Sequence, residues 1–203
     1  MLKQIALACG LALTVAGCAS SNWETNYVQV PAAQAAQWRV AAVNVTAPQT
    51  LTTSEVNSYT PNFDVVWHGE PYGDRRAQAA AIVREGIQRG ATVARGKTPV
   101  RVEAVIQQFH AVTPVTRQRE WMNAGVHDIR YTVQVFNAKT GAALTEPQLI
   151  RADFPALTGK AGDQADARGF TQRAQIVNHI AAVTQNWLGQ GKDVRGGFSR
   201  LGR

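Results

Sequence analysis

The clearest structural pattern in this sequence is Val126-His127-Asp128-Ile129-Arg130-Tyr131-Thr132-Val133-Gln134-Val135-Phe136. Apolar and polar side chains alternate along it, and β-branched and aromatic residues are frequent. Successive side chains of a strand point to opposite faces of a sheet, so the pattern predicts a strand with one buried face. That face would carry Ile129, Tyr131, Val133 and Val135, with Asp128, Arg130, Thr132 and Gln134 on the other.

Further strands are predicted on both sides of this stretch. Residues 137–141 form a turn of hairpin type, and a partner strand follows from Ala142 to Leu144 and resumes at 148–154. Upstream, Val100 to Val112 begins in strict alternation that slips at Val105-Ile106, which indicates a bulge. Two shorter β-branched segments, 38–45 and 63–67, are also expected to be strands.

Two helices are predicted. Asp74 can accept hydrogen bonds at the start of the first, whose apolar residues recur at helical spacing until Gly90. The second runs from about Ala167 to Leu188 after a polar loop at 158–166, and Gly189 ends it. The order of the elements predicts an α+β fold, a mostly antiparallel sheet with two helices packed on one face.

The first 17 residues have the pattern of an export signal: Lys3, a short apolar run from Ile5 to Val15, then small residues. Val15-Ala16-Gly17-Cys18 resembles the lipobox of bacterial lipoproteins. This resemblance implies cleavage before Cys18 and attachment of lipid to its sulfur. Ala19 follows the cysteine where inner-membrane lipoproteins tend to have Asp, which implies the outer membrane, facing the periplasm. The alternative is an ordinary signal peptide in which Cys18 is incidental.

The expected organisation follows from these features. A signal peptide at 1–17 precedes the lipidated Cys18 and a flexible tether at 18–37, which is small and polar. The α+β domain spans 38–189, and a basic, disordered tail spans 190–203. Cys9 lies in the signal and Cys18 would carry lipid, so no intramolecular disulfide is expected.

Composition restricts the partners. The net charge of +7 favours anionic lipid, cell-wall polymer or an acidic protein, and the basic tail could contact lipid or cell wall. Nucleic acid is not expected, because an exported protein rarely meets it. The lipid on Cys18 would make the membrane itself a partner.

The sequence lacks the motifs of the common catalytic and cofactor sites. Gly90 to Thr98 has five residues where a phosphate-binding loop needs four before Gly-Lys-Thr, and it follows a helix rather than a strand. The four histidines lack metal-ligand spacing, and no Gly-x-Ser-x-Gly occurs. We therefore expect no metal, cofactor or enzymatic activity. A pair of catalytic carboxylates stays open, with the candidates Glu70, Asp74, Glu103, Glu120 and Asp128.

Two loops could bind a partner. The first contains Arg117, Arg119 and Trp121, residue types enriched at interaction surfaces, and the second contains Tyr72. The alternative for the first loop is that Trp121 covers the core while the arginines are solvated.

The layout resembles that of small bacterial envelope lipoproteins. The hairpin at 136–144 and the order of elements are similar to the lipoprotein activators of penicillin-binding proteins and to the curli-export lipoprotein. The start Trp38-Arg39-Val40 is similar to that of uncharacterised small lipoproteins. No functional residue is implied by either resemblance.

The expected function is that of a lipid-anchored, non-catalytic interaction module serving an envelope assembly, with an envelope protein as partner. The alternative is a carrier of lipid or glycan with a groove between helices and sheet. In a carrier, the large aromatic residues would line a cavity rather than fill the core: Trp67, Phe109, Tyr131 and Trp187.

Overall fold

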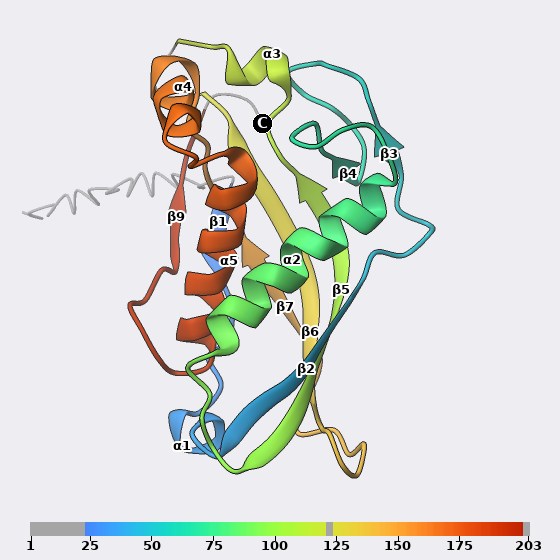
Figure 1. Ribbon diagram of the computed structural model, residues 1–203, viewed down its shortest axis with the longest axis vertical. Helices are drawn as coiled ribbons and strands as arrows, with labels where there is room; N and C mark the ends of the chain where they lie inside the picture. The colour runs from blue at the N-terminus through green and yellow to red at the C-terminus, as the bar shows by residue number, and fades with distance from the viewer. Residues whose placement is uncertain (1–22, 121–123, 201–203) are drawn as a thin grey trace, which may run out of the picture.

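The computed structural model describes residues 23–120 and 124–200 (Figure 1). The predicted signal peptide, Cys18 and Trp121 lie outside the described residues. The strands are β1 (Trp23–Asn26), β2 (Trp38–Thr46), β3 (Thr53–Ser54), β4 (Val65–Val66), β5 (Thr98–His110), β6 (Val126–Asn137), β7 (Gln148–Ala152), β8 (Phe154–Pro155) and β9 (Gly196–Phe198). The helices are α1 (Ala32–Ala35), α2 (Arg75–Ala91), α3 (Pro114–Arg117), α4 (Gly159–Ala167) and α5 (Gln172–Trp187).

A mixed, mostly antiparallel sheet forms the centre of the molecule, as the predicted fold class requires. Its strand order is β3-β4-β5-β6-β7-β1-β9, with β2 on β5 and β8 on β6. The pairs β5–β6, β6–β7, β7–β1 and β1–β9 are antiparallel, whereas β2 and β4 run parallel to β5. The sheet is open, because β9 and β3 end the order without pairing to each other.

The two long strands confirm the alternation seen in the sequence. The side chains of Ile129, Tyr131 and Val135 in β6 have no exposed surface, and Val133 is 1% exposed. The register of β5 on β6 shifts between Ile106 and Gln108, next to the slip in the pattern. The alternation fails at the start of β6, where His127 and Asp128 are buried as well as their neighbours.

Helix α2 begins as predicted but ends later. Asp74 accepts hydrogen bonds from the main-chain N–H groups of Arg76 and Ala77, the geometry of an N-cap. Gly90 does not end the helix, which continues to Ala91. A Cβ atom at Gly90 would lie 2.4 Å from the carbonyl oxygen of Ala181 in α5, so this glycine lets two helices approach closely.

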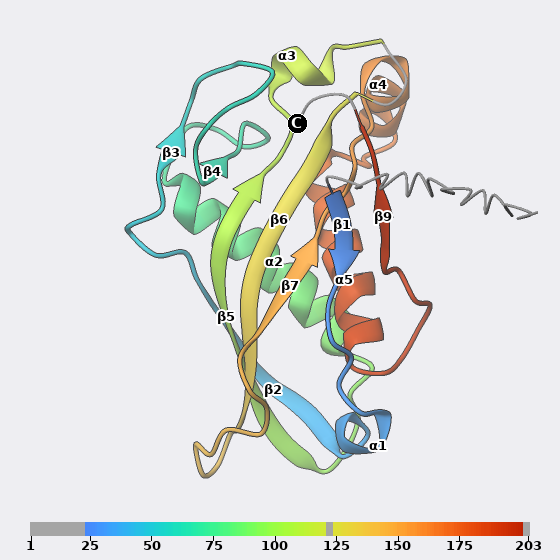
Figure 2. The same cartoon turned by 180° about the vertical axis from the view of Figure 1, so that it is seen from behind.

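Five helices are present in the described residues, rather than the two that the sequence predicts. The two long ones, α2 and α5, cross each other over the same face of the sheet (Figure 1). The opposite face is open to the viewer when the molecule is turned round (Figure 2). The short helices lie at the ends of the strands.

The predicted loop and helix of the C-terminal third are placed wrongly. Residues 159–167 are helical, as α4, and α5 begins only at Gln172. Gly169 has a φ of +76°, which breaks the helix between them. Thr171 then accepts a hydrogen bond from the Ala174 N–H and starts α5.

The predictions of a flexible tether and a disordered tail are also wrong, because residues near both ends of the described chain form strands of the sheet. β1 pairs with β7 on one side and with β9 on the other. Trp23 stacks on Phe198, with 6.5 Å between the ring centroids. The domain therefore begins by Trp23 rather than Trp38, and residues 196–198 are a strand.

Candidate functional site

The structure brings the two predicted binding loops together at one end of the molecule. The loop after β4, helix α3 and helix α4 all lie there (Figure 1). We call this surface the loop end and define it as residues 59, 68–73, 114–120 and 159–173. A pocket of about 260 Å³ opens within it, between His68, α3, Asp166 and the first turn of α5.

Arg75 holds the Tyr72 loop in place. Its guanidinium donates to both oxygens of Glu55, at 2.6 and 2.8 Å, and to the carbonyl oxygens of Glu70 and Pro71. The charge-assisted pair lowers the pKa of Glu55. Arg75 is buried, whereas the ring of Tyr72, 5.8 Å from its guanidinium carbon, is 85% exposed. An aromatic ring thus projects from a fixed loop.

Arg117 has an internal role. Its guanidinium donates to the carbonyl oxygens of Leu157 and Gly162 and pairs with the carboxylate of Asp166. The side chain is only 13% exposed, so it links α3 to α4 and offers a partner little surface. The alternative of a solvated arginine therefore does not hold for Arg117, which also lines the loop-end pocket.

Arg119, the second arginine predicted as a contact residue, lies near the surface. Its guanidinium carbon lies 4.2 Å from the ring centroid of Tyr59, a cation–π distance, and Tyr59 is 43% exposed. Together with Tyr72, these residues give the loop end two aromatic rings and a cation. The predicted contact at Trp121 lies outside the described residues.

The wall of the pocket formed by α5 is polar and largely charge-paired. Arg173 bonds to Glu70 at 2.9 Å and to Glu85 at 2.6 Å, tying α5 to the Tyr72 loop and to α2. Gln172 beside it is 9% exposed, and its Oε1 atom has no hydrogen-bond partner among the described residues. Burial lowers the pKa of His68.

The carboxylates proposed for catalysis are mostly used in structure. Asp74 caps α2, Glu70 pairs with Arg173, and Glu103 pairs with Arg101. Asp128 lies fully buried near Asp153, where burial and the neighbouring carboxylate raise the pKa of Asp153 to about 7. Neither aspartate has exposed surface for a substrate. Among residues 23–120 and 124–200, no three side chains are placed to hold a metal ion.

The large aromatic residues named for a carrier lie in the packed core. Trp67, Phe109 and Tyr131 have no exposed surface and Trp187 is 1% exposed. Trp67 and Phe109 contact edge to face, with 6.0 Å between ring centroids. None of the four lines the loop-end pocket.

The sequence does not predict the ion pairs that hold the segments of the loop end together. Arg173 and Glu70 are 103 residues apart, and Arg117 and Asp166 are 49 apart. No local spacing marks such pairs. Arg75 is the exception. It directly follows Asp74, the cap of α2, so its place in the sequence puts it next to the loop that precedes the helix.

A family model matches residues 38–203, which is most of the chain. The chain belongs to DUF6778, a family of unknown function. A search of curated proteins finds no match. No helix in the described part of this DUF6778 protein has both the length and the apolar character needed to cross a bilayer.

Several solved structures are similar to this chain at low identity and with TM-scores below 0.5. Protein XCC0632 from Xanthomonas campestris, of family DUF330, is 11% identical with a TM-score of 0.46, covering 81% of this chain and 89% of its own. A PelC dodecamer from Paraburkholderia phytofirmans is 11% identical with a TM-score of 0.39, covering 81% and 96%. A "putative lipoprotein" from Caulobacter crescentus CB15 is 10% identical with a TM-score of 0.35, covering 78% and 92%. None of these similarities assigns a function to the chain.

Proposed function

We propose that this DUF6778 protein is a lipid-anchored, non-catalytic module of the bacterial envelope that binds a protein partner through its loop end. The lipid would be on Cys18, and the outer membrane, facing the periplasm, is the proposed location. The convergence of the two loops carries this proposal. Tyr72 projects from a loop that Arg75 fixes, and Arg119 lies on Tyr59 at the same end.

The chemistry of this surface suits protein recognition. Tyr and Arg dominate the energetic centres of protein interfaces, and they bind best when they are held in place before contact. Here, three ion pairs hold the supporting segments: Arg75–Glu55, Arg173–Glu70 and Arg117–Asp166. A partner would therefore order few side chains when it binds.

The packed aromatic core supports this function over the carrier. A carrier needs an apolar cavity that encloses its ligand. The four aromatic side chains that could line one contact the core instead. The involvement of the candidate carboxylates in caps and ion pairs supports a non-catalytic role in the same way.

Crosslinking in living cells tests the proposal. A photoreactive amino acid at Tyr72 or at Arg119 should give the same discrete protein adduct, identified by mass. Lys139, at the hairpin on the opposite end, is the control position and should give none (Figure 1). Adducts to lipid or glycan alone, no adducts, or an equal adduct from position 139 would contradict binding through the loop end.

A further inference from the structure

Strand β2 has an open edge. Among the described residues its ladder partner is β5, which it meets in parallel register from Trp38 to Thr46. On its other side, within the described part of the chain, Arg39 forms a bridge to Arg95 and the Trp38 carbonyl oxygen accepts a hydrogen bond from the Gly96 N–H. An unpaired strand edge offers N–H and C=O groups to another chain, and proteins usually protect such edges with Lys, Pro or a covering segment. After Arg39, β2 carries no charge and no proline.

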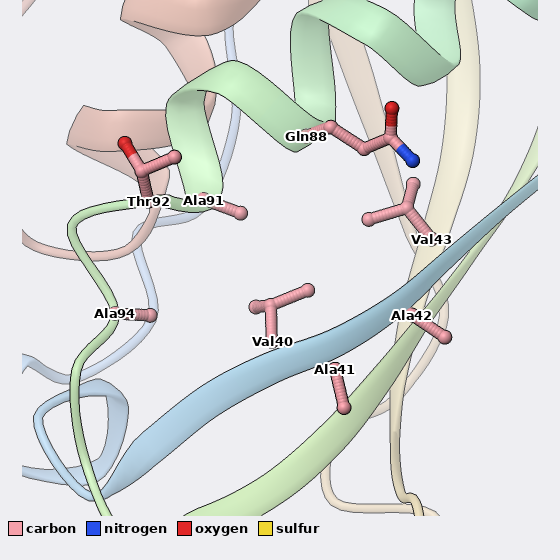
Figure 3. Close-up of a pocket in the computed structure, with 8 residues that line it drawn as sticks. All are labelled: Val40, Ala41, Ala42, Val43, Gln88, Ala91, Thr92 and Ala94. Carbon is pink, nitrogen blue, oxygen red and sulfur yellow. The ribbon is translucent and has the colours of Figure 1, made fainter.

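A bulge divides this edge in two. The register with β5 passes from Val40 directly to Ala42, which leaves Ala41 unpaired. Ala41 and Ala42 both point away from α2, as neighbours do at a bulge (Figure 3). A bulge itself hinders strand addition, so the regular part that another chain could meet is Ala42–Thr46, where the Val45 carbonyl oxygen has one long hydrogen bond, from Arg84.

A pocket of about 300 Å³ lies beside the open edge, between β2 and the C-terminal part of α2. Val40 and Val43 point toward the helix and form one wall (Figure 3). Ala91 and Ala94 form much of the rest, and Gln88 lies at the helix side. These short side chains leave room for an aliphatic side chain.

The surroundings of the edge are basic. Arg84 donates from Nη2 to the carbonyl oxygen of Val45 at 3.4 Å, and Arg39 and Arg95 are exposed at the start of β2. Within residues 23–120 and 124–200, none of these three guanidinium groups forms an ion pair with a carboxylate. Their charge is available to balance acidic groups on a bound chain.

We propose that β2 is a docking strand for an extended, acidic segment of a protein partner. The segment would add to the sheet at Ala42–Thr46 and place one aliphatic side chain in the pocket between β2 and α2. Strand addition of this kind obtains affinity from main-chain hydrogen bonds and specificity from pockets for alternate side chains. This site is separate from the loop end and does not depend on it.

Charge selects this occupant over a second copy of the chain. Pairing β2 with the β2 of another copy would bring Arg39, Arg84 and Arg95 of both copies to one interface. The carboxylate of Glu103, beside Asn44 of β2, is already paired with Arg101. Like charges at an interface disfavour association. An acidic strand would instead bring negative charge to the same three arginines.

The test uses the purified full chain in a non-ionic detergent and a defined probe, a short peptide of alternating Glu and Val with blocked ends. We expect binding that weakens with salt, with amide NMR shifts confined to β2 and to residues 88–95. The same peptide with its donor amides N-methylated keeps its charge but cannot pair with a strand. It should bind at least about tenfold more weakly.

Two double variants separate this site from general charge attraction. R39E with R95E should weaken binding of the peptide at least about tenfold, whereas K139E with K192E makes the same charge change elsewhere and should leave binding within about twofold. Equal binding of the N-methylated peptide, or equal loss in both double variants, would overturn the proposal. So would shifts outside β2 and residues 88–95, binding only to micelles that contain anionic lipid, or dimerisation through β2 in sedimentation.

Discussion

At the scale of single residues, two glycines determine how closely the long helices pack. A Cβ atom at Gly86 would lie 2.6 Å from Cβ of Ile180, and one at Gly90 would lie 2.4 Å from a main-chain oxygen of α5. Main chain inside a helix cannot move away cheaply. The close contact therefore outweighs the gain in helix propensity, about 1 kcal/mol, that alanine would otherwise bring.

We expect G90A to lower the free energy of unfolding by about 1–3 kcal/mol, measured by urea denaturation. Gly196 is the control, because an added Cβ there meets nothing within 4 Å. G196A should change stability by less than about 0.5 kcal/mol. A G90A variant as stable as the parent would mean that α2 and α5 are packed less tightly than the structure shows.

His127 is a second residue with a measurable consequence. Its side chain is fully buried and packs against Phe154 in a tilted arrangement, with 4.7 Å between ring centroids. Neither ring nitrogen has a hydrogen-bond partner among the described residues. Burial lowers the pKa of His127 to about 3. Below its ordinary pKa of about 6.5 the unfolded chain takes up a proton that the folded chain does not, so its contribution to stability falls as the pH drops from about 6.5 to 3.

We expect H127F to be more stable than the parent by about 1 kcal/mol at pH 7, because two unsatisfied polar atoms are removed. Its stability should also fall less between pH 6.5 and 4. H179F is the matched comparison in the same ring stack, where burial lowers the pKa of His179 to about 4 but Nε2 lies 3.2 Å from Thr25 Oγ1. H179F should also make stability depend less on pH, but it should not raise stability at pH 7. Denaturation at several pH values measures both, and a destabilised H127F would show that the ring nitrogens do have partners.

At the scale of elements, the edge of the sheet formed by β1 and β9 depends on contacts between the two ends of the chain. β9 has three residues, and its ring contact is Phe198 on Trp23. F198A should lower stability by about 1 kcal/mol and speed hydrogen exchange at Thr25, which pairs with Gly196 of β9. F170A removes a phenylalanine ring, 38% exposed, that lies outside β1 and β9, and it should leave exchange in β1 unchanged. If exchange in β1 is fast already in the parent chain, β9 is not a stable strand.

The elements that could be predicted are those with local signals. Asp74 marks the start of α2, and alternation over many residues marks β5 and β6. β1 and β9 have no such signal, because four and three residues are too few to show a period. Their order comes from pairing across the whole chain, and local composition therefore suggested a tether and a tail.

The candidate site shows the same difference between features with a local sequence signal and features that depend on distant residues. Aromatic and basic composition pointed to Tyr72 and Arg119, since exposure of such residues is a property of their own loops. The internal use of Arg117 could not be foreseen, because it depends on Leu157, Gly162 and Asp166 in a distant segment. Nor does the sequence show that β2 lies at an open edge, which is a property of the strand order.

At the scale of the whole molecule, the lipid on Cys18 is the prediction with the widest consequence. In cells fed labelled palmitate, the parent chain should carry label, sediment with membranes and have the mass of a chain cleaved before Cys18. C18S should carry no label, because the acceptor sulfur is absent. If C18S is instead cleaved and released with the same processed polypeptide as the parent, the segment before it is an ordinary signal peptide.

If Cys18 carries the proposed lipid, the inclusion of β1 in the sheet limits how far this molecule can move from that anchor. Cys18 lies five residues before Trp23. A fully extended chain spans about 3.5 Å per residue, so the segment that joins the two residues is at most about 18 Å long. β1 begins in the half of the molecule that carries α3 and α4, while the hairpin and the start of β2 lie at the far end (Figure 2). A lipidated molecule would therefore stand on the bilayer with the loop end near the lipid surface. A partner there would itself sit at the membrane, and the β2 edge would reach outward for partners in the space beyond.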